Sequence, residues 1–195
     1  MINPDRPLLL ASASRYRAEL LARLRLPYTA VGSQVDETPR PGETVAVLVQ
    51  RLARDKAQAL VARHPQQWVL GSDQAAALAD GRILGKPGSR EMAIEQLLAV
   101  SGNSVDFLTS VALWDGRRWH EALDTTTVRF RSLTRGQVER YIDQEPAFDC
   151  AGSFKCEGYG ISLFEAIDSS DPTGLIGLPL IALRRLLTNA GYDLP

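Results

Sequence analysis

Short apolar runs and longer stretches with helical spacing alternate along the chain. Apolar residues three or four positions apart indicate one face of a helix, whereas a short uninterrupted run indicates a buried strand. The clearest helix covers Thr44–His64, where apolar residues form one stripe and Thr44 stands at the N-cap position. The same spacing predicts helices over Ser14–Leu24, Ser89–Val100, Thr134–Ile142 and Gly177–Asn189.

Apolar runs bounded by turn residues predict the strands. Single runs of this kind are Pro7–Ser12, Tyr28–Val31, Trp68–Gly71 and Gly158–Phe164. Two turn dipeptides, Asp80-Gly81 and Asp115-Gly116, predict hairpins that pair 75–78 with 83–84 and 105–113 with 118–130. Because helices and strands alternate without a strict βαβ repeat, the sequence predicts an α/β fold with a mixed sheet.

Length and charge restrict the class of protein. The chain has 195 residues, of which 45% are hydrophobic and 23% charged, as in ordinary globular proteins. At roughly 150 residues per domain, this length predicts one domain over residues 1–195, or two lobes around one cleft. The 22 basic and 23 acidic side chains give a net charge of −1. Binding to bulk nucleic acid usually shows as a basic excess, so this balance argues against such a partner but allows a small anionic ligand.

Local features argue against three further classes. The longest apolar runs are far shorter than the ~18 residues that suggest a membrane span. The N-terminal segment lacks the layout of a secretory signal peptide. Cys150 and Cys156, the two cysteines, form neither a disulfide framework nor a CxxC motif. We therefore expect reduced thiols, no membrane segment and a cytoplasmic protein.

The common catalytic motifs are missing from the sequence. The stretch 81–87, Gly-Arg-Ile-Leu-Gly-Lys-Pro, ends in proline where a P-loop needs its metal-binding hydroxyl. Neither a G-x-G-x-x-G motif after a strand nor a G-x-S-x-G motif occurs. His64 stands at a helix end and His120 beside a turn, so we expect both on the surface. The chemistry is then left to carboxylates, cations and hydroxyls.

A first candidate site lies where the strand over 7–12 leads into the helix over 14–24. Ser12, Ser14 and Arg17 stand at this helix start. Unpaired N–H groups and the helix dipole favour a phosphate there. The alternative is an N-cap serine with a solvated arginine.

Charged residues stand out at four other positions. Lys56 lies inside the apolar stripe of its helix, so its side chain must snorkel, form a pair or point into a cleft. Asp73 follows a buried strand, where α/β sheets place ligand sites but where a side chain can also cap a turn. Glu37 and Lys86 lie in loops and are either solvated or part of a site. Together with Arg17, these residues suit a polyphosphate and a divalent cation, because Mg²⁺ takes one or two carboxylates with water and phosphate oxygens.

The same positions carry a resemblance that runs almost from end to end. The matching segments are L-A-S-A-S-R-Y-R (10–17), V-D-E-T-P (35–39), R-L-A-R-D-K-A (51–57), G-S-D-Q (71–74), G-K-P (85–87), S-G-N (101–103), C-A-G-S-F-K-C-E-G-Y-G (150–160) and G-L-I-G-L-P (174–179). In this order they resemble the Maf family of nucleoside triphosphate pyrophosphatases. G-S-D-Q and G-S-F-K-x-E-G are typical of the branch that hydrolyses 7-methyl-GTP.

The resemblance implies a mixed central sheet flanked by helices and two lobes around a deep nucleotide-binding cleft, a Maf/ITPase-like fold. It implies that Asp73 accepts the proton of the attacking water, and that Glu37 helps catalysis or holds the metal with Asp73. The cofactor would be Mg²⁺ or Mn²⁺. Because the family is often dimeric, a homodimer is among the expectations. The residues that would hold the triphosphate are Ser12, Ser14, Arg17, Lys56 and Lys86.

The resemblance assigns base specificity to the positions of Tyr16, Gln74 and Glu157. N7-methylation leaves guanine cationic, which favours an aromatic face such as that of Tyr16. Glu157 can accept hydrogen bonds from guanine N1–H and the 2-amino group together, a pair of donors that thymine and uracil do not offer. Arg15 stands where the family commonly has proline, which suits the first helical turn. It either lies in solvent or adds a phosphate contact.

We therefore expect a nucleoside triphosphate pyrophosphatase that converts 7-methyl-GTP to 7-methyl-GMP and diphosphate and so clears modified nucleotides. One alternative is the same chemistry on dTTP or UTP. Another is a non-catalytic nucleotide-binding regulator, for instance of cell division. Binding alone would not require a carboxylate beside the phosphates, which disfavours the regulator.

Overall fold

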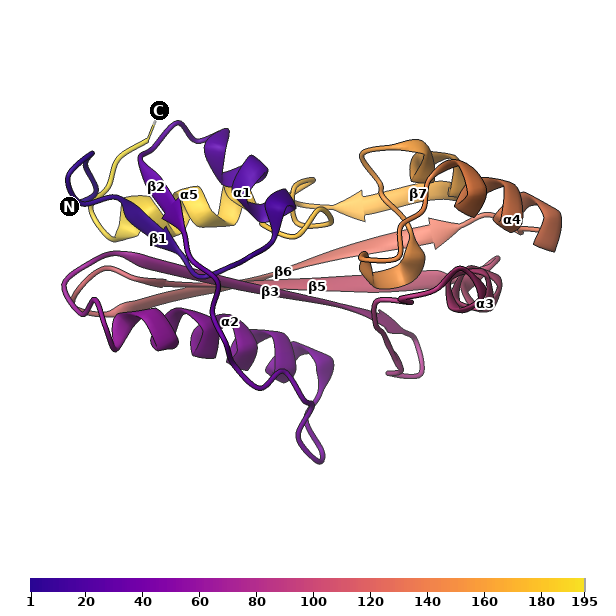
Figure 1. Ribbon diagram of the computed structural model, residues 1–195, viewed down its shortest axis with the longest axis horizontal. Helices are drawn as coiled ribbons and strands as arrows, with labels where there is room; N and C mark the ends of the chain where they lie inside the picture. The colour runs from indigo at the N-terminus through magenta and orange to yellow at the C-terminus, as the bar shows by residue number, and fades with distance from the viewer. Residues whose placement is uncertain (195) are drawn as a thin grey trace. The chain divides into compact units, whose positions relative to one another are not determined.

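The computed structural model describes residues 1–194, and the chain divides into two compact units (Figure 1). Unit 1 contains residues 1–74, 109–124 and the C-terminal segment from Asp171, and unit 2 contains residues 75–108 and 125–170. Three strands have residues in both units: β3 (Val69–Leu78), β5 (Ser104–Trp114) and β6 (Trp119–Phe130). The expectation of a single domain stays a prediction.

The strands form a mixed sheet in the order β2-β1-β3-β5-β6-β7, with β4 paired to β3. Strand β1 (Leu8–Leu10) runs parallel to β2 (Tyr28–Ala30) and to β3. Strand β4 (Ile83–Leu84) runs antiparallel to β3, and β7 (Phe164–Ser169) runs antiparallel to β6. The predicted α/β fold with a mixed central sheet flanked by helices is therefore confirmed. The deep cleft stays a prediction.

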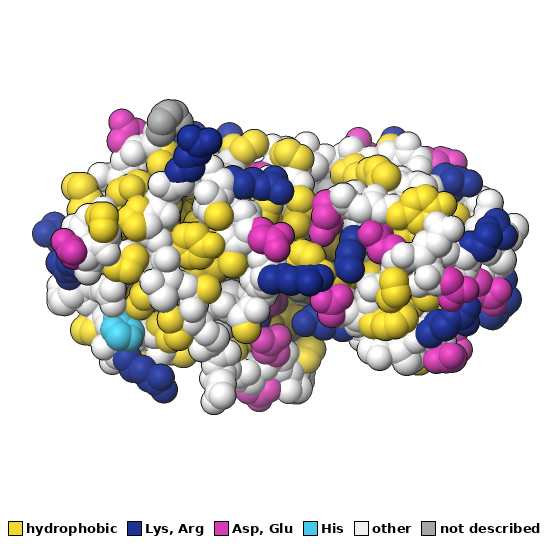
Figure 2. All heavy atoms as spheres, turned by 45° about the horizontal axis from the view of Figure 1, so that its top comes forward, with side chains coloured by type: hydrophobic (Ala, Val, Ile, Leu, Met, Phe, Trp, Pro, Cys, Tyr) yellow, Lys and Arg dark blue, Asp and Glu magenta, His cyan; other side chains and the backbone are white. Residues whose placement is uncertain are grey.

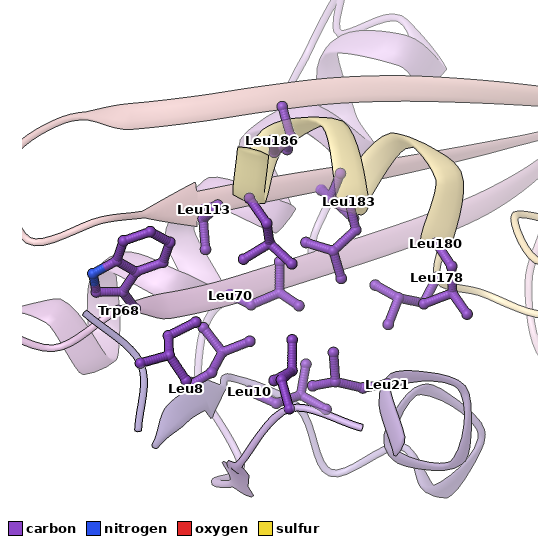
Figure 3. Close-up of a cluster of buried hydrophobic side chains, with 14 of the residues drawn as sticks. Leu8, Leu10, Leu21, Trp68, Leu70, Leu113, Leu178, Leu180, Leu183 and Leu186 are labelled. Carbon is purple, nitrogen blue, oxygen red and sulfur yellow. The ribbon is translucent and has the colours of Figure 1, made fainter. Parts of the chain in front are cut away.

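The layers of unit 1 follow from the alternation of side chains along its strands, because successive side chains point to opposite faces of a sheet. Leu8, Leu10 and Leu70 lie in one apolar cluster with residues of α1 (Arg15–Ala22) and α5 (Leu180–Asn189) (Figure 3). Leu9 and Val69 lie in a second cluster with residues of α2 (Val45–Val61). Helix α2 therefore packs on the face of β1 and β3 opposite to α1 and α5.

Unit 2 is built around aromatic side chains. Phe107, Phe130, Phe154 and Phe164 pack edge to face, with ring centroids 4.8–5.6 Å apart. Helix α3 (Arg90–Val100) contacts α4 (Arg135–Gln144) and the 3₁₀ helix η1 (Ala151–Ser153). A second 3₁₀ helix, η2 (Tyr159–Leu163), precedes β7.

The predicted helices are confirmed, with differences at their ends. The side chains of Ser14, Thr44, Ser89 and Thr134 each cap the helix that follows by accepting an N–H of its first turn. Helix α5 begins three residues later than predicted, because the preceding residues close a turn in which Gly177 N–H donates to the Thr173 carbonyl over 3.3 Å.

Two strand predictions need correction. The strand predicted over Gly158–Phe164 is wrong, because η2 occupies 159–163 and β7 begins only at Phe164. The Gly160 N–H donates to the Glu145 carboxylate over 3.0 Å instead of to a neighbouring strand. The runs 68–71 and 75–78 are parts of one strand, β3, since the polar residues between them find partners inside the protein.

The expectation that both histidines lie on the surface is half wrong. His64 is exposed, but the side chain of His120 is only 9% exposed, and its Nε2 lies 2.7 Å from Asp115 Oδ2. On the face drawn in Figure 2, basic and acidic side chains are interspersed, as expected for a net charge of −1. Within residues 1–194, no helix has the length and apolar character needed to cross a membrane.

Candidate active site

A buried ion cluster forms where helix α2 meets strand β3. The side chains of Lys56 and Asp73 are only 8% and 9% exposed, and the Lys56 ammonium donates to Asp73 Oδ1 over 2.6 Å. The ammonium also lies 2.8 Å from Glu37 Oε1, whose side chain is 60% exposed. Of the three expectations for Lys56, snorkelling, pairing or pointing into a cleft, the structure shows pairing. Lys56 joins two carboxylates that are far apart in the sequence.

Gly71 explains why α2 and β3 come close enough for this pair. A Cβ at Gly71 would overlap the carbonyl oxygen of Ala53 and would lie 2.9 Å from the backbone nitrogen of Ala57. Asp73 stands two residues after Gly71 on the same strand, so both face α2. Lys56 lies three residues after Ala53, on the same buried helix face. The glycine therefore brings the helix face that carries Lys56 against the strand face that carries Asp73.

The surroundings of Asp73 raise the pKa of its carboxyl above the usual value. Burial is the main cause, and the negative charge of Glu37 adds to it. The positive charges of Lys56 and Arg17 oppose this rise, and so does the hydrogen bond from Lys56. Burial thus makes the Asp73 carboxylate more basic than a solvated aspartate, and the two cations limit that rise in its pKa.

The hydroxyls at the start of α1 serve the helix itself. Ser14 Oγ accepts the Arg17 N–H at 3.4 Å, and Ser12 Oγ accepts the Ser14 N–H at 3.1 Å. Arg17 is not the solvated side chain of the alternative interpretation, because it is half-buried and its Nε donates to the Gly177 carbonyl over 2.9 Å. Burial lowers the pKa of the Arg17 guanidinium, while the charges of Asp73 and Glu37 raise it. Arg17 therefore belongs electrostatically to the Lys56–Asp73–Glu37 cluster.

The carbonyl of Gly177 is an anchor that the sequence reasoning missed. It accepts from Arg17 Nε and also from the hydroxyl of the fully buried Ser72, over 3.1 Å. Gly177 has a φ of +123°, a conformation that L side chains rarely adopt. The available signal is the G-L-I-G-L-P segment (174–179), in which Gly177 is one of two glycines and stands two residues before a proline. A left-handed glycine thus fixes the direction in which Arg17 extends.

Gln74 holds the same turn from a second side. Its amide nitrogen lies 2.8 Å from the Gly174 carbonyl and 3.0 Å from both the Leu175 carbonyl and the Thr109 hydroxyl. The Thr109 hydroxyl in turn donates to the Gly174 carbonyl over 2.9 Å. The amide nitrogen of Gln74 therefore donates only within the protein, and the amide oxygen is the group that can bind a ligand.

Asp171 joins this turn to helix α5. Its Oδ2 accepts the N–H groups of Ile181 and Ala182 over 2.6 and 3.1 Å, and its Oδ1 accepts the Thr173 hydroxyl over 2.7 Å. The Thr173 hydroxyl accepts the Leu180 N–H over 2.8 Å. A buried carboxylate at a helix N-terminus is favoured by the free N–H groups and the helix dipole. The turn that carries Gly177 is thereby fixed to a core helix.

Arg15 and Tyr16 contact one another at the surface of α1. The Arg15 guanidinium carbon lies 4.8 Å from the centre of the Tyr16 ring, and Arg15 Nη2 donates to the Tyr16 hydroxyl over 2.8 Å. The structure thus places the residue that departs from the family pattern on the aromatic ring expected to bind the base.

Lys86 and Glu157 lie in unit 2, and both residues are exposed. Lys86 has no ion pair among the residues that the structure describes. The Glu157 carboxylate accepts a weak hydrogen bond from Cys156 Sγ at 3.4 Å, and burial raises the pKa of that thiol to about 12. Both residues are described within their own unit, and their place in one site with Asp73 stays a prediction.

Comparison with known proteins decides the family. Residues 7–190 match the model of the Maf family, described as Maf-like protein. The protein belongs to the Maf family. The prediction made from the ordered motifs is confirmed.

Three relatives of this Maf protein are named 7-methyl-GTP pyrophosphatase. The one from Xanthomonas axonopodis pv. citri is 56% identical over 188 residues, which cover 96% of this chain and 98% of the relative. The one from Pseudomonas syringae pv. syringae is 53% identical over 190 residues, which cover 96% of this chain and 98% of the relative. The one from Pseudomonas aeruginosa is 50% identical over 194 residues, which cover 98% of this chain and 100% of the relative. Among solved structures, the Ham1 protein of Staphylococcus aureus aligns over 64% of this chain and 72% of its own, with a TM-score of 0.45 and 19% identity.

Carboxylates are the candidate metal ligands of this Maf protein. Among residues 1–194, no group of three or more His, Cys, Asp or Glu side chains is arranged to hold a metal ion. Asp73 and Glu37 each contact Lys56 through one oxygen, and within the same residues their other oxygens have no hydrogen-bond partner. Mg²⁺ typically takes one or two carboxylates and completes its shell with water and phosphate oxygens. Two carboxylates would suffice for a cation that shares its shell with a nucleotide, and binding of such a cation by Asp73 and Glu37 stays a prediction.

Proposed function

We propose that this Maf protein is a nucleoside triphosphate pyrophosphatase that converts 7-methyl-GTP to 7-methyl-GMP and diphosphate. The observation that carries the proposal is the buried Lys56–Asp73 pair with Glu37 at its exposed edge. It supplies a base of raised pKa beside a cation, as phosphoanhydride hydrolysis requires. The choice of nucleotide is supported by relatives of that name, 50–56% identical over nearly the whole chain.

In the proposed reaction, Asp73 accepts a proton from a water molecule whose oxygen attacks the α-phosphorus. The bond between this oxygen and the α-phosphorus forms as the bond from the α-phosphorus to the bridging oxygen breaks. The bridging oxygen leaves with diphosphate and takes the electron pair of the broken bond. The rise in the pKa of Asp73 suits this role, because a base is more effective as its pKa approaches the working pH.

Charge balance supports a divalent cation in the proposed site. The formal charges of Arg17 and Lys56 cancel those of Glu37 and Asp73, so these four residues alone do not neutralise a triphosphate. Mg²⁺ or Mn²⁺ bound by Asp73 and Glu37 together with phosphate oxygens would supply the missing positive charge and polarise the phosphoryl group. Ser12, Ser14, Arg17, Lys56 and Lys86 are the proposed phosphate-binding residues.

Base selectivity is proposed to come from three side chains. The Tyr16 ring offers a face to the cationic methylated base. Glu157 accepts from guanine N1–H and the 2-amino group, and a site built on such hydrogen bonds rejects bases that lack the donors. Gln74 contributes its amide oxygen, because its amide nitrogen already donates within the protein.

The experiment is diphosphate release from 7-methyl-GTP, GTP, dTTP and UTP with Mg²⁺ or Mn²⁺. We expect a preference for 7-methyl-GTP that Glu157→Gln reduces. Glu165→Gln is the matched control, since Glu165 is another exposed glutamate of unit 2. A preference for dTTP or UTP would overturn the proposed selectivity for 7-methyl-GTP and would leave the proposed pyrophosphatase reaction intact. No turnover by folded protein with either metal would overturn the enzyme proposal in favour of a nucleotide-binding regulator.

The proposed partner is a free nucleoside triphosphate, and clearance of modified nucleotides is the proposed role. A cytoplasmic location, a homodimer and the absence of a nucleic-acid partner stay predictions.

A further inference from the structure

Gln96 on helix α3 bridges two segments of unit 2 that each carry a proposed site residue. Ser153 Oγ donates to Gln96 Oε1 over 2.6 Å, and Gln96 Nε2 donates to the Gly85 carbonyl over 3.2 Å. We name residues 85–89 the Lys86 segment and residues 150–158 the Glu157 segment. A third contact links the Lys86 segment to Phe148, two residues before the Glu157 segment, because the Gly88 N–H donates to the Phe148 carbonyl over 3.2 Å.

The chemistry of the partners fixes the orientation of the Gln96 amide. The Gly85 carbonyl can only accept, so the amide NH₂ group must face it. The amide oxygen then faces Ser153, whose hydroxyl donates. One side chain thus satisfies a donor on the Glu157 segment and an acceptor on the Lys86 segment. Glutamate, the charged isostere, could accept from the Ser153 hydroxyl but has no N–H to donate to the Gly85 carbonyl.

The Ser153 end of this bridge holds an unusual backbone. Ser153 has a φ of +65° and is fully buried, and Gly152 before it has a φ of +78°. A non-glycine residue in this region is strained and persists only where its surroundings hold it. Its hydroxyl has no other hydrogen-bond partner within residues 1–194, so the bond to Gln96 supplements the backbone bond from the Ser153 N–H to the Cys150 carbonyl, over 3.2 Å, in holding this turn. The turn precedes Glu157 by four residues.

We propose that Gln96 is a positioning residue that couples the Lys86 segment to the Glu157 segment. The amide of Gln96 then fixes the positions of both the proposed phosphate-binding lysine and the proposed base-binding glutamate. The inference rests on the proposed function, because it assigns these roles to Lys86 and Glu157. Gln96 itself does not contact the nucleotide. Its loss changes how well both segments are held and leaves the chemistry of Asp73 intact.

The matched variants separate the two ends of the bridge. Gln96→Ala removes both bonds, Ser153→Ala removes only the bond to the Glu157 segment, and Gln96→Glu keeps an acceptor for Ser153 while placing an oxygen against the Gly85 carbonyl. Glu95→Ala, at the exposed neighbouring position of α3, is the control.

Hydrogen exchange of the full chain without nucleotide is the first readout, and it does not depend on activity. We expect faster exchange in both segments for Gln96→Ala, mainly in residues 150–158 for Ser153→Ala, and mainly in residues 85–89 for Gln96→Glu. Glu95→Ala should match the wild type. Unchanged exchange in either segment of Gln96→Ala would overturn the coupling, whether or not the protein proves to be a pyrophosphatase.

Kinetics with 7-methyl-GTP and GTP is the second readout. For Gln96→Ala we expect kcat/KM for 7-methyl-GTP to fall on the order of tenfold, because misplacing binding groups by about 1 Å can cost ~100-fold in rate. The preference over GTP should fall too, with most of the change in KM. An unchanged preference and KM would refute Gln96 as a positioning residue. If the wild type hydrolyses neither nucleotide, the proposed function fails, and the exchange experiment still decides the coupling.

Discussion

Gly71 on strand β3 lies against Ala53 on helix α2, with no room for a side chain between them. This contact places Lys56, three residues along the helix, against Asp73, two residues along the strand. A buried ion pair is stable only when its geometry is good, since both charges lose their hydration. The close approach at Gly71 therefore determines whether the proposed catalytic base has its partner.

Gly71→Ala should destabilise the protein by about 1–3 kcal/mol, because the added methyl overlaps backbone atoms that cannot turn aside. It should also weaken the Lys56–Asp73 contact and lower kcat. Gly136→Ala is the control, as the nearest atom to its new methyl is Arg140 Nη1 at 3.6 Å and a helical alanine is favourable. Thermal unfolding and diphosphate release measure both effects. Equal stability of the two variants would refute the close approach.

Asp73→Asn should lower kcat by about 10²–10⁴-fold, because asparagine keeps the shape of the side chain but cannot accept the proton. Circular dichroism should show an intact fold, and the KM should change less than kcat. Diphosphate release under saturating 7-methyl-GTP is the measurement. Turnover within a few fold of the wild type would remove Asp73 from the role of general base.

The pH profile should reflect the raised pKa of Asp73. The carboxyl acts as a base only when ionised, so kcat/KM should fall with decreasing pH at a value above the usual aspartate pKa of about 3.9. Lys56 lowers the pKa of Asp73, so Lys56→Met should move this acidic limb to higher pH. Glu37 raises it, so Glu37→Gln should move the limb to lower pH. Shifts of both variants in the same direction would contradict the assignment.

Gly177→Ala should raise the KM for the nucleotide, because alanine is strained at a φ of +123° and the carbonyl that anchors Arg17 would turn. The strain itself should cost about 1–3 kcal/mol of stability. Gly191→Ala is the control: its φ is +90°, and no atom lies within 4 Å of the new methyl. Ser72→Ala, which removes the second donor to the same carbonyl, should have a smaller effect than Gly177→Ala. A KM as high for Gly191→Ala as for Gly177→Ala would show that the Arg17 anchor is unimportant.

Local sequence signals predicted much of this fold. The stripe of α2 and its cap at Thr44 were readable because spacing and capping are local properties. The strand predicted over Gly158–Phe164 failed because its apparent run reflects a 3₁₀ turn tied to Glu145, a contact between distant positions that no local pattern records. The sequence predicted an interruption in strand β3 for a related reason, since the partners of the polar residues 72–74 are remote in the chain and local patterns assign such residues to loops.

By itself, the sequence determined that Lys56 stands at a buried position and that Asp73 ends an apolar run, since periodicity reports burial. It also determined the family, because the ordered motifs span nearly the whole chain. Only the tertiary structure decided that Lys56 pairs with both Asp73 and Glu37, that Gly177 anchors Arg17, and that Gln96 joins two distant segments. These are contacts between residues remote in the chain, and packing of helices on the sheet selects them after local structure has formed.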